Sequence, residues 1–250
     1  MHIHVQETKD ELESSIAGNH ACPSCHKSSR LCSPIQNMAS LGILDHTCCA
    51  HCVHVLDEDI ELLAQHHASV VHCPHSNLKL GSGIAPVQKM LDKGVNVCLG
   101  TDGASSNNNL DMMGEMRTAA LIGPIAAGDA KAVDAVTALE MATLNGAKAL
   151  GLQDVIGSIE VGKHADLIAI DMNRLESLPI HNLFSNLVYA TGKEQVTHVW
   201  VQGKCLMEER NLTTLKLEEL CTKAKEWRDT LRASNPYADN GAVDPCSSPF

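Results

Sequence analysis

The chain has 250 residues, of which 44% are apolar and 20% charged, and its formal net charge is −11. Its length allows a sizeable buried core. Without an apolar run of ~20 residues or a signal-peptide pattern, we expect no membrane partner and a cytoplasmic location. The acidic balance argues against nucleic acid as a partner, because phosphate binding needs a basic face.

Short apolar runs alternate with helical patterns over the first 150 residues. We expect strands at 2–6, 47–53, 69–73 and 95–100, and helices at 34–44, 57–67, 84–94, 109–122 and 134–150. Asp57 is the expected N-cap of the second helix, and 72–86 reads as a long polar loop. The alternation of strands and helices is typical of an α/β fold with a parallel sheet.

The pattern changes after residue 150. The segments 156–171 and 195–206 are predicted to be β structure with turns, and an amphipathic helix is predicted for 214–231. The domains we expect are therefore a first domain at 1–150, a β segment at 151–213, a C-terminal helix at 214–232 and a disordered tail at 233–250.

Titratable residues stand at or just after the ends of several predicted strands, at Glu7, His54, His75 and Asp102. In a β/α barrel, chemistry is carried at the C-terminal rim of the strands. We therefore expect a functional site along this edge of the sheet.

The first strand begins with HIHVQET. His2 and His4 are two positions apart and face the same side of a strand, so they could hold one metal ion. Glu7 falls past the end of the strand, where it could reach a bound ligand. The alternative is an edge strand with solvated histidines.

Two later stretches, AHCVHV and GTDGASSNNNLDM, raise the same question. His51 and His54 should lie on opposite faces if their strand stays regular, so at most one points inward. Asp102 follows a buried strand in a glycine-rich turn that lets a ligand approach closely. The alternative for AHCVHV is a histidine of the core or of the sheet's rim without a functional role. The alternative for Asp102 is a simple Asx-turn.

The eleven cysteines do not predict a disulfide framework, because an odd number cannot all pair and a chain of this length can fold without disulfides. Cys48, Cys49, Cys52 and Cys73 lie in or beside apolar runs, so we expect them to be reduced and structural. The stretch CPSCHKSSRLC at 22–32 could be read as a haem attachment or a zinc knuckle. No second CxxC pair follows it at zinc-finger spacing, and a loop with incidental thiols is preferred.

Several motifs together resemble one family. They are IHVQET, AHCVHV, HCPHSNLKLGSGIAPV, LGTDGASSNNNLDMMGEMRTA, ATLNGAKALGL and GSIEVGKHADLIAID. Their order resembles the amidohydrolase superfamily, in its branch of 5′-methylthioadenosine / S-adenosylhomocysteine deaminases, and enzymes of the atrazine chlorohydrolase type share much of the pattern. The resemblance implies a metal-dependent-hydrolase (β/α)8 barrel, one divalent metal ion, usually Zn²⁺, and a small composite β-sandwich.

The resemblance also implies residue roles. His4 and Asp102 would bind the metal, and His51 would steady the attacking water. Asp102 would accept a proton from that water and Glu7 would deliver one to the purine ring, whereas Asn77 would border the substrate. His2 has no metal role in this assignment.

In this family IHVQET belongs to the fifth barrel strand. We therefore expect the C-terminal half of the barrel (strands 5–8), part of the sandwich and a C-terminal helix, and a chain that is a poor enzyme without its N-terminal half. A partner chain supplying that half, or a homo-oligomer, is then possible. The rival reading takes His2-Ile3-His4 itself as the HxH of the first strand.

The function that the resemblance implies is hydrolytic deamination of an adenosine-type nucleoside, with release of ammonia. Two alternatives stay open. One is a related hydrolase acting on guanine or s-triazine substrates, and the other is a non-catalytic half-barrel. Zinc is expected from the His and Asp ligands, although iron or manganese would also suit them.

Overall fold

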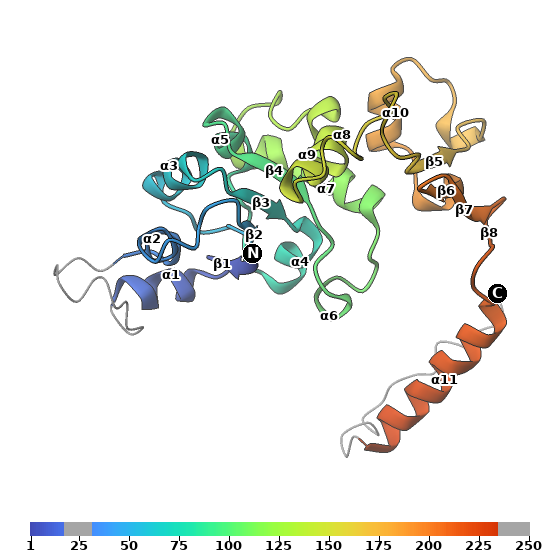
Figure 1. The fold of residues 1–250 in the computed structure, drawn as a ribbon, viewed down its shortest axis with the longest axis horizontal. Helices are drawn as coiled ribbons and strands as arrows, with labels where there is room; N and C mark the ends of the chain where they lie inside the picture. Colours follow the sequence, from blue (N-terminus) through green and yellow to red (C-terminus); the bar gives the residue numbers. More distant parts are fainter. Residues whose placement is uncertain (18–31, 235–250) are drawn as a thin grey trace.

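The first part of the chain forms a four-stranded parallel sheet (Figure 1). A computed structural model describes residues 1–17 and 32–234. The strands are β1 (His2–Val5), β2 (Cys48–His51), β3 (Ser69–His72) and β4 (Asn96–Leu99), and they pair side by side in the order β1-β2-β3-β4. The predicted α/β alternation and the parallel pairing are confirmed.

Helices connect and follow these strands. They are α1 (Lys9–Ile16), α2 (Pro34–Ser40), α3 (Asp57–Gln65), α4 (Pro74–Leu80), α5 (Val87–Asp92), α6 (Ala104–Asn107), α7 (Met112–Ala127), α8 (Ala135–Ala142) and α9 (Leu144–Ala149). Polar side chains begin several of them: Thr8, Asp111 and Asp134 each accept a hydrogen bond from the first turn of their helix.

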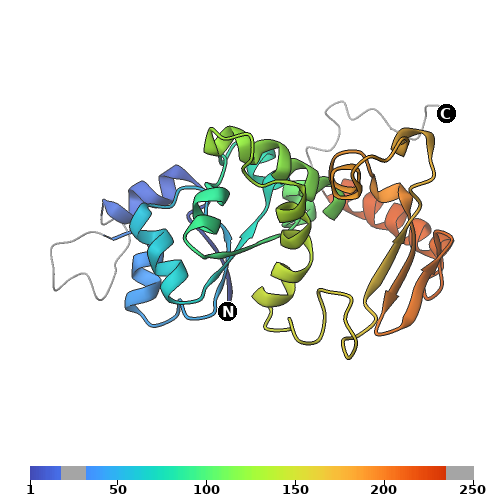
Figure 2. The ribbon, with the colours of Figure 1, turned by 90° about the horizontal axis from the view of Figure 1, so that it is seen from above.

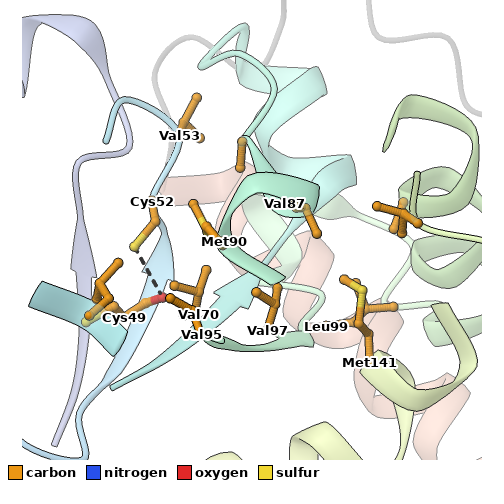
Figure 3. Packing of buried hydrophobic residues seen from close by; sticks show 14 of the residues in the cluster. Cys49, Cys52, Val53, Val70, Val87, Met90, Val95, Val97, Leu99 and Met141 are labelled. Atoms are coloured by element: carbon orange, nitrogen blue, oxygen red, sulfur yellow. Dashed lines mark hydrogen bonds between the residues drawn. The ribbon is translucent and has the colours of Figure 1, made fainter. Parts of the chain in front are cut away.

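The core lies between this sheet and its helices. Figure 3 shows valines of β3 and β4 beside Met90 of α5, with Cys49 and Cys52 nearby. Cys48, Cys49, Cys52 and Cys73 are all buried free thiols, as expected for structural cysteines. β2, β3 and β4 are buried along most of their length, which explains their largely apolar sequences, whereas His2 and His4 of β1 are exposed.

A second sheet follows, and Figure 2 shows it beside the first part of the molecule. Its antiparallel strands are β5 (Leu167–Ile170), β6 (Val196–Val201), β7 (Lys204–Glu208) and β8 (Asn211–Leu212). The helix α10 (Leu183–Tyr189) packs against α7 and α8, and the Arg117 guanidinium donates to the carbonyl oxygens of Val188 and Thr191. The two parts of the chain are joined through these contacts.

The helix α11 (Leu217–Ser234) ends the described chain, and all its residues are exposed. Within residues 1–17 and 32–234, no helix combines the length and apolar composition needed to cross a bilayer. β5 and β6 fall within the expected β segments, whereas β7 extends to Glu208, β8 lies beyond them, and α11 continues to Ser234, into the part of the chain expected to be a disordered tail. The division into domains remains a prediction.

The structure corrects the expected helix boundaries in several places. The N-cap of α3 is Leu56 rather than Asp57, because Asp59 accepts a hydrogen bond from the Leu56 backbone N–H and fixes the start there. The expected helix at 134–150 is two helices, broken at Thr143 by its backbone angles φ −130° and ψ −94°.

The predicted polar loop at 72–86 is also wrong in part, since α4 occupies most of it. Pro74 stands in the first turn of α4, and Gly81 closes it with a φ of +71°. The candidate haem or zinc stretch at 22–32 falls almost wholly outside the described residues, as does the tail from 235 onward.

Candidate metal centre

Five predicted site residues meet at one edge of the parallel sheet. His4 lies in β1, His51 ends β2, and Asp102 follows β4. Glu7 comes after β1 and Asn77 lies in α4, which follows β3. Because all four strands run in the same direction, their carboxyl ends bring these residues together.

The backbone around the site departs from regular strand geometry. His51 has a φ of +72° and Asp102 a φ of +58°, both in the left-handed region that side chains other than glycine rarely adopt. His51 is therefore turned out of the strand alternation, so the expectation that His51 and His54 lie on opposite faces of a regular strand does not apply.

Three potential ligand atoms form a tight cluster. One ligand atom from each of His4, His51 and Asp102 lies within 4.8 Å of the other two. The Nε2 atom of His4 is 3.4 Å from Oδ1 of Asp102, and the Nε2 atom of His51 is 4.0 Å from Oδ2. Imidazole nitrogen and carboxylate oxygen are donors that zinc prefers, so this donor set suits a divalent cation.

The imidazole of His51 is oriented by Asn77. Its Nδ1 atom lies 2.8 Å from the Asn77 Oδ1 acceptor, so Nδ1 carries the proton and Nε2 has a free lone pair. The Nε2 atom is buried and has no hydrogen-bond partner. Metal-binding histidines typically donate their second N–H in this way, so the orphaned nitrogen fits either a cation or its bound water.

Asp102 is held as a carboxylate by its surroundings. Its Oδ2 atom accepts hydrogen bonds from Ser76 at 2.7 Å and Ser106 at 2.6 Å. Burial alone would raise the pKa of Asp102, but hydrogen bonds from Ser106, Ser76, the Gly103 backbone and His4 hold that pKa well below its usual range. The side chain can therefore act as an anionic ligand.

Glu7 lies next to His51. Its Oε2 atom is 3.8 Å from His51 Nε2, and its Oε1 atom accepts a hydrogen bond from Ser82 at 3.1 Å. The turn that carries it is fixed by Glu11, whose carboxylate accepts the backbone N–H groups of Gln6 and Glu7. A partly exposed carboxylate is thus placed within reach of a ligand at the cluster.

A cavity of about 500 Å³ opens beside His4 and Asp102 on the face of the sheet. It is lined by His2, Ile3, His4, Ala50, Val71, Cys73, Gly100, Thr101 and Asp102. This volume is in the range of small-molecule sites. A Cβ at Gly100 would lie 2.7 Å from Val71 Cγ1, so any other residue at this position of the lining would force the Val71 side chain to move.

Other polar residues named from the sequence lie outside the cluster. His54 contacts the carbonyl oxygen of Ser82, and His75 contacts Glu115 and Thr118. Sequence reasoning missed Ser76 and Ser106, because nothing in their surroundings marks a serine that will point at an aspartate 26 or 4 positions away. His2 lines the cavity but does not belong to the ligand cluster.

Comparison with known proteins gives a consistent picture. The model of the amidohydrolase family matches residues 1–206. A 5-methylthioadenosine/S-adenosylhomocysteine deaminase of Teredinibacter turnerae is 50% identical over 238 residues, which cover 93% of this chain and 50% of that protein. The chain spans about half the length of the curated relatives it matches.

Solved structures show the same relationship. An adenosine deaminase from Xanthomonas campestris with bound zinc superposes with a TM-score of 0.86 at 42% identity, covering 93% of this chain and 51% of that one. Atrazine chlorohydrolase from Arthrobacter aurescens, complexed with zinc, gives a TM-score of 0.78 at 26% identity, covering 90% and 48%.

Proposed function

The chain belongs to the amidohydrolase family, and we propose that its cluster of His4, His51 and Asp102 is the metal centre of a hydrolytic deaminase. The substrate we propose is an adenosine-type nucleoside, 5′-methylthioadenosine or S-adenosylhomocysteine. Relatives at 43–50% identity carry that name, and the adenosine deaminase structure is more similar to this chain than the triazine enzyme, at 42% against 26% identity.

The observation that carries the proposal is the convergence of His4 and Asp102 at 3.4 Å, with the unpartnered Nε2 of His51 beside them. When bound, a divalent cation supplies a water molecule whose pKa is lowered towards ~7. His4 and Asp102 would hold this cation, and His51 would either join them or accept a hydrogen bond from the water. Zinc fits this donor set best, and iron or manganese would also suit it.

The remaining residues would move protons. Asp102, whose pKa is held well below its usual range by its hydrogen bonds, would be ionised and would accept the proton that the water gives up. Glu7 would deliver a proton to the ring nitrogen N1 as the bond from the water oxygen to C6 forms. Asp102 would then pass the proton it took from the water to the C6 amino group, which would leave as ammonia when the C6–N bond breaks, and the remaining hydroxyl proton would return to Glu7. Asn77 would fix the tautomer of His51 and border the substrate. General acid and base assistance of this kind is worth roughly 10²–10⁴-fold in rate.

We further infer that β1–β4 correspond to strands 5–8 of a (β/α)8 barrel and that β5–β8 form part of a composite sandwich. The strict order of the four parallel strands supports this correspondence. A catalytic zinc ion usually has three protein ligands. The activity of this chain alone is therefore weak if His51 holds the water, and full activity needs a further ligand from a partner. The buried free thiols support a reducing, cytoplasmic location.

The experiment has a metal arm and an activity arm. Equilibrium dialysis of residues 1–250 against Zn²⁺ should give about one ion per chain, with loss on Asp102→Asn. Ammonia release is then measured from 5′-methylthioadenosine, guanine and atrazine. Each assay uses the chain alone and the chain mixed with the part of the Teredinibacter turnerae protein that it does not cover. Zinc-free protein that releases no ammonia in either form would contradict the proposal and favour a non-catalytic half-barrel.

A further inference from the structure

One carboxylate behind the metal centre joins the two segments that shape it. Glu115 of α7 is fully buried. Its Oε2 atom accepts a hydrogen bond from the His75 backbone N–H at 3.1 Å, and its Oε1 atom lies 2.9 Å from His75 Nδ1. Oε1 also accepts a hydrogen bond from Asn107 Nδ2 at 2.5 Å. A single side chain therefore contacts both the start of α4 and the end of α6.

The contact with His75 leads directly to two site residues. The next residue along α4, Ser76, donates to Asp102 Oδ2 at 2.7 Å. The one after it, Asn77, accepts from His51 Nδ1 at 2.8 Å. Anchoring the His75 backbone and ring thus fixes the start of the helix turn that orients Asp102 and His51.

The contact with Asn107 leads to the loop that carries Asp102. The same Nδ2 group donates to the carbonyl oxygen of Thr101 at 2.7 Å, immediately before Asp102. Asn107 Oδ1 accepts the backbone N–H groups of Asn109 and Leu110. This side chain therefore ties both ends of the loop together, at the point where Asp102 adopts its left-handed φ of +58°.

The chain is shaped to permit this arrangement. A Cβ at Gly114 would lie 3.0 Å from His75 Cε1, so the absence of a side chain there lets α7 approach His75. The other ring nitrogen of His75 is 2.7 Å from Thr118 Oγ1. Burying a carboxylate is unfavourable unless it is fully hydrogen-bonded, and Glu115 meets that condition through bonds to these two segments.

We propose that Glu115 is a positioning residue of the metal centre, which holds Asp102 and His51 in place through Asn107 and His75. The inference rests on the proposed function for its purpose, because positioning has a use only if a ligand binds at the cluster. Groups that orient metal ligands from behind typically contribute 10–100-fold to metal affinity.

The first test needs no metal. Hydrogen–deuterium exchange is measured for peptides covering 74–80 and 101–110 in the wild-type chain and in Glu115→Gln, with Glu140→Gln on the exposed surface of α8 as the matched control. Exchange in both peptides should become at least about tenfold faster in Glu115→Gln, while peptides from the core of the sheet keep their protection. In Asn107→Ala the acceleration should be confined to 101–110.

The second test measures Co²⁺ affinity from the visible absorption of the bound ion. Glu115→Gln should weaken binding about 10–100-fold and alter the spectrum, while Glu140→Gln should change neither. If Glu115→Gln does not fold, Asn107→Ala and Gly114→Ala give the same readouts with smaller perturbations.

The outcomes of the two tests separate the two proposals. A wild-type chain that binds no Co²⁺ contradicts the proposed metal centre, and the exchange data still decide the role of Glu115. The positioning role is overturned if the folded variants exchange at the wild-type rate and, where the wild type binds Co²⁺, bind it with unchanged affinity.

Discussion

The Nε2 atom of His4 lies 3.4 Å from Oδ1 of Asp102, although the two residues are 98 positions apart in the chain. The contact spans the sheet from its first strand to the loop after its fourth. Both side chains can still bind a metal ion. His4 is largely exposed, and Asp102 accepts its two serine hydrogen bonds on Oδ2 and not on Oδ1.

Removing either of these two side chains should abolish tight metal binding. We expect His4→Ala and Asp102→Asn each to weaken Zn²⁺ binding at least ~100-fold, because loss of a direct ligand exceeds the effect of losing an outer partner. Isothermal titration calorimetry measures the change. His2→Ala is the matched control on the same strand and should leave the affinity within about twofold of wild type. An equal effect of His2→Ala would favour the rival HxH reading of β1.

His51 can act as a ligand or as the group that holds the water, and one variant separates these roles. If His51 is a ligand, His51→Ala should lower Zn²⁺ affinity as strongly as His4→Ala. If it holds the water, affinity should stay near wild type while ammonia release falls ~10²–10⁴-fold. Asn77→Ala removes the acceptor that orients the His51 ring. Whichever of the two changes His51→Ala produces, we expect Asn77→Ala to produce the same change to a smaller extent. An effect of Asn77→Ala larger than that of His51→Ala would show that Asn77 does not act through His51.

Glu7→Gln should slow catalysis without removing the metal. The variant keeps the shape of the side chain and the contact with Ser82 but cannot deliver a proton, so ammonia release should fall ~10²–10⁴-fold. The measurement uses the chain mixed with the part of the Teredinibacter turnerae protein that it does not cover. Zinc content should be unchanged, and loss of zinc would instead make Glu7 part of the metal-binding set.

His72 should make the protein less stable as the pH falls. It is fully buried with both ring nitrogens unpartnered, and burial, together with electrostatic repulsion from the neighbouring His51, lowers its pKa to about 4. The unfolded chain binds this proton near pH 6.5, so the free energy of unfolding should decrease by about 3 kcal/mol between pH 6.5 and 4 from this group. Urea unfolding at several pH values should show a flatter dependence in His72→Leu. The exposed His164→Leu should leave the slope unchanged.

Gly157 and Gly162 offer a matched test of packing before the second sheet. Both have a positive φ, at +90° and +99° respectively. A Cβ at Gly157 would lie 2.6 Å from Ala147 Cβ, whereas nothing lies within 4 Å at Gly162. Gly157→Ala should therefore reduce the free energy of unfolding by ~1–3 kcal/mol more than Gly162→Ala. Equal melting temperatures of the two variants would show that Ala147 moves aside.

The sequence predicts the parallel sheet well, because strands buried on both faces read as short apolar runs between helical patterns. The edge that carries the site follows from the same pattern, since parallel strands place all their C-terminal residues at one rim. The pattern predicts Glu7, His54, His75 and Asp102 at this rim, but His54 and His75 lie outside the cluster. His4 and His51 are assigned to the metal centre only through the family resemblance.

Other features depend on contacts that no local pattern records. The left-handed turn at His51 breaks the alternation on which the strand prediction depends, and the hydrogen bond from Ser106 to Asp102 is a matter of side-chain direction. The helix α4 did have a signal, because Pro74 and Gly81 mark its start and end. Glu115 lies within a motif that was recognised, but only the structure gives it a possible role.

The left-handed backbone at His51 and Asp102 lowers the stability of the fold, but it directs both side chains into the cluster. Each such residue costs about 1–3 kcal/mol, and glycine at either position would relieve the conformational strain. The same change would delete the imidazole or the carboxylate that the turn presents. Selection for a more robust fold is therefore expected to act on distant helices and loops, where substitutions do not compromise the reactive edge.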